Sequence, residues 1–317
     1  MSISSPRAFR AFCWGTLGYM LGVIAWGAFV RATGSGAGCG DHWPTCNGEL
    51  LPRAPSQQTL IELIHRLTSG LAGLLVLGQL VWAFVAFPRR HPVRGAVVAS
   101  MMFLLLEAGL GAGLVLFEWV AHDVSTGRAM AMSVHLVNTF LFLGTLTWVC
   151  FHAREGAEPL PRPLRAGQLS WVALALGGVL LTGVSGAVAA LGDTLLQVSV
   201  PQGAVSLQRS PLLGVLLQLR LLHPVLAVAA AAVVLAAAGR LASLHRPLAG
   251  ALAALVPVQL GAGVLNVVLK APVWMQLSHL LIADVMWILL VWLGLHQLAL
   301  PAEGRMEETP SPARLAS

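Results

Sequence analysis

Residues 60–87 read LIELIHRLTSGLAGLLVLGQLVWAFVAF, a stretch that is long and apolar enough to cross a membrane as one helix. A hydrocarbon core of about 30 Å requires roughly 20 predominantly apolar residues in an α-helix. Similar stretches occur at approximately 11–30, 95–117, 129–151, 168–190, 212–238, 247–269 and 273–300. We therefore predict an all-α integral membrane protein with eight transmembrane helices.

The composition agrees with this prediction. Charged residues make up 10% of the chain and apolar residues 57%, whereas soluble domains have roughly 25% and 45–50%. Strand-like alternation is absent, and lipid cannot satisfy exposed backbone groups, so a helical bundle is favoured over a barrel. No basic run is interleaved with aromatic residues. We therefore expect membrane lipid around the protein and no nucleic acid among its partners.

The basic residues predict the orientation, because cytoplasmic loops carry an excess of arginine and lysine. On the side of the N-terminus lie Arg7, Arg10, Arg89, Arg90, Arg94, Arg154, Arg162, Arg165, Arg240, Arg246, Arg305 and Arg314. The opposite loops carry Arg31, Arg53, Arg128, Arg209 and Lys270. This bias predicts a multi-pass protein of the cell inner (cytoplasmic) membrane with both termini in the cytoplasm. Residues 11–30 lack a convincing cleavage site, so we expect a retained helix.

The cysteines fall on both predicted sides of the membrane. Cys39 and Cys46 lie in the first external loop, in a compartment that permits disulfides, and a disulfide between them is favoured. A metal site is the alternative, but tetrahedral zinc would need two more ligands, with only Asp41 and His42 nearby. Cys13 and Cys150 lie near the predicted cytoplasmic ends of their helices. We interpret them as small apolar residues.

The two halves of the chain resemble each other. LGAG recurs at 110–113 and 260–263, and GAFVRATG at 27–34 has a weaker echo in GAVAALGD at 186–193. Four helices per repeat is an even number, so both halves would insert with the same orientation. The prediction is two parallel-repeat four-helix bundles: an N-terminal half at 1–151, a cytoplasmic linker at 152–167, a C-terminal half at 168–300 and a cytoplasmic tail at 301–317.

Four histidines lie near the external start of every second predicted helix. In the repeat, His65 corresponds to His223 and His135 corresponds to His279. Each half therefore presents two histidines. A single intramembrane histidine can simply hydrogen-bond a neighbouring helix, but four at repeat-related positions favour ligation. Neutral imidazole is a good ligand for heme iron, and facing helices of a bundle can house a heme. We therefore predict two bis-histidine heme sites.

Charged residues accompany these histidines. Glu62 precedes His65 by three residues and shares its helix face, where a carboxylate could move protons, although a Glu62–Arg66 pair at the membrane surface is the alternative. Arg66 and Arg220 are candidates for contacts with heme propionates. The sequence also places Glu107 and Asp284 inside the membrane, where they need partners. The remaining histidines lie near boundaries and in loops, and we assign them no site role: His42, His91, His122, His152, His245 and His296.

The motifs resemble those of the heme A synthase family. The run GAFVRATGSGAGCGDHWPTCNGELLP at 27–52, then ELIHRLTSGLAG at 62–73 and the three later histidines, carry the resemblance over nearly the whole chain. In the first loop, Asp41-His42-Trp43-Pro44 and Cys39-Gly40 depart from the usual pattern. Residues 191–211 also lack the second external cysteine pair of some members.

This resemblance implies an oxidoreductase that converts a methyl group of heme O to the formyl group of heme A for cytochrome oxidase. Two successive hydroxylations would give a geminal diol that loses water. By resemblance, His223 and His279 ligate the iron of a resident heme b, His65 and His135 hold heme O as substrate, and Glu62 is the essential carboxylate. Heme O synthase is the implied partner. The electron partner and any homo-oligomer stay open.

Two other classes of protein use similar features. A di-heme b electron carrier that oxidises quinol would need the same four histidines but no release of heme from one half. A parallel-repeat transporter is less well supported, because broken helices with midplane Gly/Pro sites are not evident.

Overall fold

The computed structural model describes residues 6–121, 123, 125–154, 166–199, 211–243 and 245–298, with the backbone alone at 166–170, 193–199 and 211–220. The helices are α1 (Pro6–Ala32), α2 (Gln57–Ala86), α3 (Pro92–Leu116), α4 (Thr126–His152), α5 (Ala166–Ser199), α6 (Pro211–Leu241), α7 (Arg246–Val268) and α8 (Val273–Leu298), with a 3₁₀ turn, η1, at Ser35–Ala37. All eight predicted helices are confirmed. The main difference is α5, which extends to Ser199 instead of ending near residue 190.

Each of the eight helices is long and apolar enough to cross a membrane. The outward-facing side chains are apolar as well: Leu74, Val85, Met102, Leu221 and Val264 are each at least 66% exposed. Such a surface would be unstable in water but suits a lipid solvent. The chain is therefore a multi-pass membrane protein.

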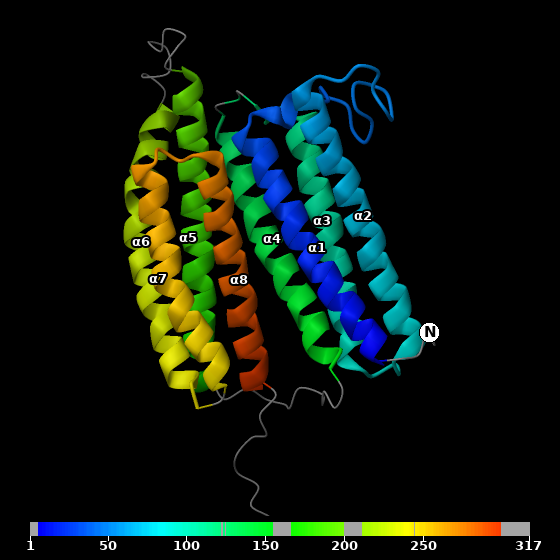
Figure 1. Cartoon of the computed structure of the whole chain (residues 1–317), viewed down its shortest axis with the longest axis vertical. Coiled ribbons are helices and arrows are strands. Elements are labelled where there is room, and N and C mark those ends of the chain that lie inside the picture. The colour runs from blue at the N-terminus through cyan, green and yellow to red at the C-terminus, as the bar shows by residue number, and fades with distance from the viewer. Residues whose placement is uncertain are drawn as a thin grey trace, which may run out of the picture.

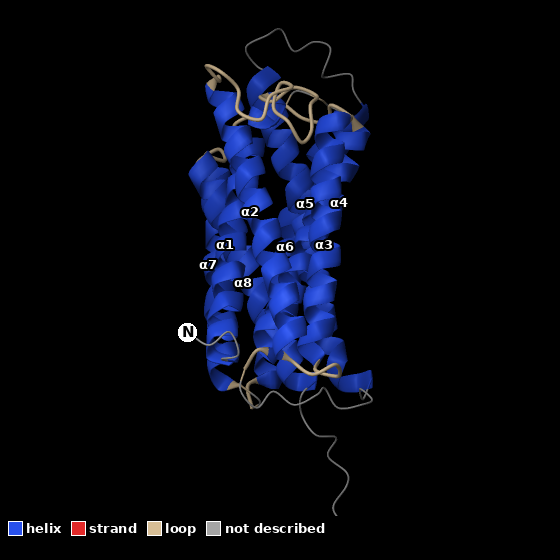
Figure 2. Ribbon diagram, turned by 90° about the vertical axis from the view of Figure 1, so that its right-hand side faces the viewer, coloured by secondary structure: helices blue, strands red, loops and turns tan. Residues whose placement is uncertain are grey.

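The helices form two groups that run along the long axis of the molecule. Figure 1 shows α1 to α4 on one side and α5 to α8 on the other. Figure 2 shows the connections gathered at the two ends of the bundle, and no strand in the described residues. We call the end with the α1–α2 connection the loop end. Of the predicted linker at 152–167, residues 155–165 lie outside the described residues, and so does the tail at 301–317. The exact domain boundaries therefore stay a prediction.

Large side chains at the centre join the two groups. Phe140 of α4 and Trp287 of α8 are buried, and their ring centroids are 5.1 Å apart. Gly144, one turn from Phe140, also lies beside the Trp287 ring: a Cβ there would be 3.5 Å from Trp287 Nε1. At the loop end, Arg31 of α1 donates to Gln276 Oε1 of α8 at 2.7 Å and to Ala190 O of α5 at 3.3 Å. One continuous core and polar contacts therefore hold the halves together.

Helix starts are capped by side chains that accept backbone hydrogen bonds. Ser56 accepts from Thr59 N, and Ser125 from Arg128 N. His91 and His245 cap α3 and α7 in the same way, each just before a proline in the first turn. Capping satisfies N–H groups that have no partner inside a helix. These two histidines thus have a local structural role, in agreement with the sequence analysis.

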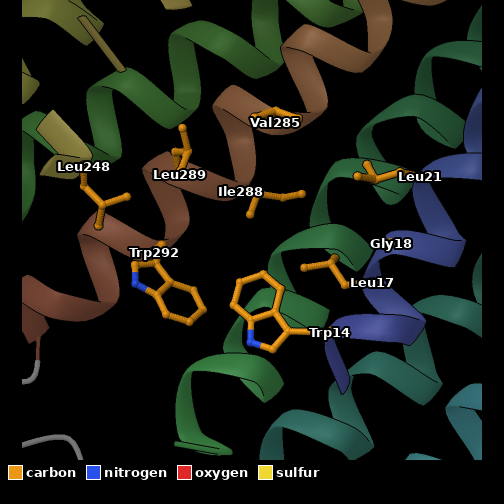
Figure 3. A pocket seen from close by; sticks show the side chains of 9 residues that line it. All are labelled: Trp14, Leu17, Gly18, Leu21, Leu248, Val285, Ile288, Leu289 and Trp292. Atoms are coloured by element: carbon orange, nitrogen blue, oxygen red, sulfur yellow. The ribbon is translucent and has the colours of Figure 1, made fainter. Parts of the chain in front are cut away.

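An apolar cleft of about 430 Å³ lies between the two groups (Figure 3). At its mouth, the ring centroids of Trp14 and Trp292 are 5.2 Å apart. The cleft is lined by Trp14, Leu17, Gly18, Leu21, Leu248, Val285, Ile288, Leu289 and Trp292. None of the residues predicted for the heme sites is among them, so this cleft is separate from the candidate site.

The connection between α1 and α2 folds back onto the start of α2. A disulfide joins Cys39 to Cys46, which confirms the predicted pairing, and no metal-binding group occurs among the described residues. Gly38 lies so close to α2 that a Cβ there would be 2.4 Å from the carbonyl carbon of Gln58. Only glycine therefore permits this approach. Cys13 and Cys150 are free and buried, as expected.

We expect thiol labelling to distinguish the two cysteine pairs. Under denaturing, non-reducing conditions, only Cys13 and Cys150 should react, because a disulfide blocks the other two. Reduction before labelling should expose all four cysteines and serves as the control. Mass spectrometry of labelled peptides is the measurement, and labelling of Cys39 or Cys46 without reduction would contradict the prediction.

Candidate functional site

The N-terminal half contains the histidine pair of His65 on α2 and His135 on α4. Both side chains are half-buried. His65 lies eight positions after the first residue of α2, and His135 nine positions after that of α4. At 1.5 Å per residue both are therefore about 12–14 Å inside the loop end of their helices.

The C-terminal half repeats this arrangement with His223 of α6 and His279 of α8. Both of these side chains are half-buried as well. His223 lies twelve positions from the start of α6, or about 18 Å, and His279 six positions from the start of α8, or about 9 Å. Each half therefore presents one pair of histidines toward the loop end, His65 with His135 and His223 with His279.

Each of the four histidines lies against a glycine of a neighbouring helix. A Cβ on Gly27 of α1 would be 2.9 Å from His65 Cε1, and one on Gly186 of α5 would be 2.8 Å from His223 Cε1. Both distances are shorter than normal contacts, so a larger residue would displace the imidazole. These two glycines therefore create the space for the rings.

The partner histidines have looser glycine contacts. A Cβ on Gly263 of α7 would lie 3.2 Å from His279 Cε1, and one on Gly111 of α3 would lie 3.7 Å from His135 Nε2. The sequence analysis missed these glycine–histidine contacts, although the signal was present. Gly27 and Gly186 are the first residues of the two weakly repeated motifs, and Gly111 and Gly263 belong to the two LGAG motifs.

The Nδ1 atoms of the histidines have different surroundings. His223 Nδ1 lies 3.2 Å from Thr182 O and 3.1 Å from Ser185 Oγ. His135 Nδ1 lies 2.9 Å from Glu107 Oε1. The Nδ1 atoms of His65 and His279 are buried without a hydrogen-bond partner. A partner at Nδ1 leaves Nε2 as the nitrogen that can ligate a metal.

The donor set fits heme and not a bare metal ion. No cluster of three or more His, Cys, Asp or Glu side chains in the described part of the chain could hold an ion. A heme needs only two axial ligands from the protein, because the porphyrin supplies the other four. Two imidazoles on facing helices, with space made by glycines, meet this need.

Glu62 is buried at the loop end of the N-terminal half, with 3% of its surface exposed. Its Oε2 accepts from Cys39 N at 2.8 Å, and its Oε1 accepts from Arg66 Nη2 at 2.5 Å. The Glu62–Arg66 pair of the alternative interpretation therefore forms, but it is buried rather than at the surface. Glu62 lies on the helix face of His65, under the disulfide-closed loop.

Arg66 fastens this loop to α2. Its Nη1 donates to His42 O at 2.7 Å and to Thr45 O at 2.5 Å. His42 itself is exposed and pairs with Asp41 at 3.1 Å. Arg66 thus links the carboxylate of Glu62 to the backbone of the loop. The side chain of Arg220, the other candidate for propionate contacts, lies outside the described residues.

The two remaining acidic residues differ in their surroundings. Glu107 has polar partners on α4, which the sequence did not identify: His135, Asn138 and Thr139. Asp284 of α8 is 1% exposed, and neither of its carboxylate oxygens has a hydrogen-bond partner. Only Glu107 therefore joins the candidate site.

Comparisons with known proteins agree with this arrangement. A protein of Thermus thermophilus named protoheme IX farnesyltransferase is 47% identical over 290 residues, which cover 89% of this chain and 47% of that protein. A heme A synthase of an Exiguobacterium species is 37% identical over 151 residues, 48% of each chain. A heme A synthase of Geobacillus kaustophilus is 41% identical over 111 residues, 35% of each chain. The chain spans about half the length of the first of these relatives.

A family profile also matches most of the chain. Residues 10–291 match the COX15-CtaA family, described as cytochrome oxidase assembly protein. The match includes all four paired histidines, Glu62 and both cysteines of the disulfide, and it confirms the resemblance found in the motifs. The chain therefore belongs to the COX15-CtaA family of cytochrome oxidase assembly proteins.

Proposed function

We propose that this protein is a heme A synthase, which oxidises the methyl group of heme O to the formyl group of heme A by successive hydroxylations. The observation that carries the proposal is the buried carboxylate of Glu62, which lies on the same helix face as His65. His65 and His135 are the two site histidines of this half. The relatives named heme A synthase support the same activity.

In this proposal the two halves divide the work. His223 and His279 hold a resident heme b, and His65 and His135 hold heme O as the substrate. Bound heme iron supplies the redox chemistry of the reaction. The protein contributes the axial imidazoles, the glycine-lined space that orients them, and a helical shell that excludes water.

Glu62 is the proposed catalytic residue because it can hold or move a proton beside the substrate site. Its hydrogen bonds from Arg66 and Cys39 fix its position. Arg66 places a positive charge near the same end of the half, where it is proposed to attract the propionates of the substrate. Arg220 is proposed for the corresponding role in the other half.

The name of the Thermus relative raises a second activity, prenyl transfer. A prenyl diphosphate is usually bound through Mg²⁺, which is held by carboxylates. The aspartates of this chain are widely separated in the sequence, at Asp41, Asp123, Asp193 and Asp284. We infer that the name describes the part of the Thermus protein that this chain does not match, and that a heme O synthase acts beside this protein to supply its substrate.

The proposed location is the cytoplasmic membrane, with both termini in the cytoplasm and the loop end outside. The arginine distribution supports this orientation. A disulfide at the loop end is consistent with an oxidising compartment on that side.

Co-expression with heme O synthase tests the activity, with Glu62→Gln as the decisive variant. We expect heme A in extracts of the unaltered protein and a decrease of about 100-fold or more in the variant, the usual size of a proton-transfer contribution. Glutamine keeps an acceptor for Arg66, so heme should stay bound. Liquid chromatography of extracted hemes is the measurement.

Glu49→Gln is the matched control, because Glu49 is an exposed acid in the same loop. It should leave heme A formation unchanged. Near-normal heme A in Glu62→Gln at equal protein level would reject the catalytic role. Unchanged heme b or heme O in the unaltered protein would instead favour the electron carrier.

His223→Ala and His279→Ala should each abolish or greatly decrease the low-spin heme b spectrum of the purified protein, because each removes one axial ligand. His42→Ala, which alters an exposed histidine, is the control and should keep the spectrum. An unshifted spectrum of full strength in both variants would contradict the assignment of the resident heme.

Gly186→Ala should lower heme b content without unfolding the protein, because the new methyl group would lie 2.8 Å from His223 Cε1 and force the ring to turn. Gly177→Ala in the same helix adds a methyl group with no atom within 4 Å and is the control. Heme per polypeptide, from absorbance and amino-acid analysis, is the measurement. Equal heme content in the two variants would show that the glycine is not needed.

A further inference from the structure

Glu107 connects α3 to three side chains of α4. Its Oε1 lies 2.9 Å from His135 Nδ1 and 2.5 Å from Thr139 Oγ1, and its Oε2 accepts from Asn138 Nδ2 at 2.5 Å. One turn further along α3, a Cβ built on Gly111 would lie 3.7 Å from His135 Nε2, an ordinary contact distance. Glu107 therefore hydrogen-bonds to one nitrogen of the imidazole, and Gly111 lies near the other.

A carboxylate at Nδ1 determines how the imidazole can bind a metal. An ionised carboxylate only accepts hydrogen bonds. A neutral His135 beside such a group carries its proton on Nδ1, which leaves Nε2 free to bind a metal. Carboxylate partners of this kind fix the ring orientation of a ligating histidine and raise its basicity. Only 20% of the Glu107 side chain and 27% of the His135 side chain are exposed, so water screens the interaction weakly.

The other three histidines of the candidate site have no such partner. His223 Nδ1 faces the neutral groups Thr182 O and Ser185 Oγ. The Nδ1 atoms of His65 and His279 have no hydrogen-bond partner at all. If the two LGAG motifs are aligned, Glu107 corresponds to Pro257. Among the described side chains, a carboxylate at Nδ1 therefore occurs beside a site histidine in the N-terminal half and is not repeated in the other half.

We propose that Glu107 is a positioning residue, which orients His135 and makes the iron held in the N-terminal half more electron-rich than the iron in the C-terminal half. This inference rests on the proposed function, because it takes His65 and His135 as heme ligands. Hydrogen bonding to an axial ligand is an established means of tuning heme potential. The heme in the N-terminal half then has the lower midpoint potential.

A purely structural role is the alternative, since Glu107 also joins two helices through Asn138 and Thr139. The two roles differ in what a change of charge would do. In Glu107→Gln the amide oxygen can still accept from His135. The new NH₂ group faces Asn138 Nδ2, so this one hydrogen bond is lost, while Asn138 Nδ2 still donates to Phe103 O. The variant therefore removes the charge, keeps an acceptor for His135 and costs one hydrogen bond between the helices.

The test uses the full chain with His223→Ala, so that only the N-terminal pair binds heme, and hemin is titrated into protein from heme-depleted cells. Adding Glu107→Gln should weaken hemin binding about 10- to 100-fold, the usual effect of losing such a partner, and shift the midpoint potential upward. Thr139→Val in the same background keeps the Glu107–His135 contact and should change neither quantity.

Unchanged affinity and potential in Glu107→Gln would overturn the inference, as would an equal shift in Thr139→Val. If Glu107→Gln does not fold, the inference can still be tested by a redox titration of the protein with Glu107 intact and hemin bound in both halves. Two reduction steps are expected, and the lower-potential step should be the one that His223→Ala keeps. The reverse assignment would overturn the inference.

These measurements do not depend on turnover. Hemin binding with the expected shifts but without heme A formation would reject the proposed function and support the role of Glu107 in iron binding. Heme A formation with no effect of Glu107→Gln on affinity or potential would reject only the role of Glu107. No hemin binding in the His223→Ala protein would overturn both.

Discussion

The contact between histidine and glycine is the constraint on which the candidate site depends. An imidazole between two transmembrane helices needs lateral space, and close packing leaves none unless a neighbouring residue is small. Gly27 and Gly186 supply this space at His65 and His223, and Gly263 and Gly111 do so less tightly at the partner histidines. The glycines thus decide where each ring can lie, and the histidines decide what can be bound.

The two halves share this framework but differ in electrostatics. The N-terminal half contains two acids within the site, Glu62 and Glu107, and both have hydrogen-bond partners. Among the described side chains, the polar groups next to His223 and His279 are the neutral Thr182, Ser185 and Gln259. Under the proposed function, one fold repeated in parallel would hold two similar hemes with different tasks. The charged groups beside one histidine pair would then distinguish the substrate site from the site of the resident heme.

The loop after α1 completes the N-terminal half. The disulfide closes a short segment, and the backbone of that segment donates to Glu62 and accepts from Arg66. Because Glu62 is buried, its charge must be compensated by nearby donors. The loop provides one donor and Arg66 provides the others. The position of the carboxylate thus depends on a segment outside the helical bundle.

The sequence determined the eight helices, the two histidine pairs and the cysteine pair. These follow from apolar length, from the repeat and from the side of the membrane, which are all local or periodic properties. Hydropathy does not fix the helix ends: the apolar segment of α5 closes near Gly192, but the helix continues to Ser199, because a helix can extend beyond the stretch that crosses the membrane. The repeated glycine motifs were visible in the sequence, but their role was not, since a glycine has no side chain that could indicate its neighbour.

Only the tertiary structure decided the partners of the buried acids. Glu107 meets His135, which is 28 positions away in the sequence, and Glu62 meets the backbone of Cys39. Such contacts depend on how two helices rotate about their axes and on how a loop folds back. Neither quantity is fixed by hydropathy, because lipid accepts many rotations of an apolar helix equally well. Packing against the other helices selects one rotation, and that selection places the charges beside the histidines.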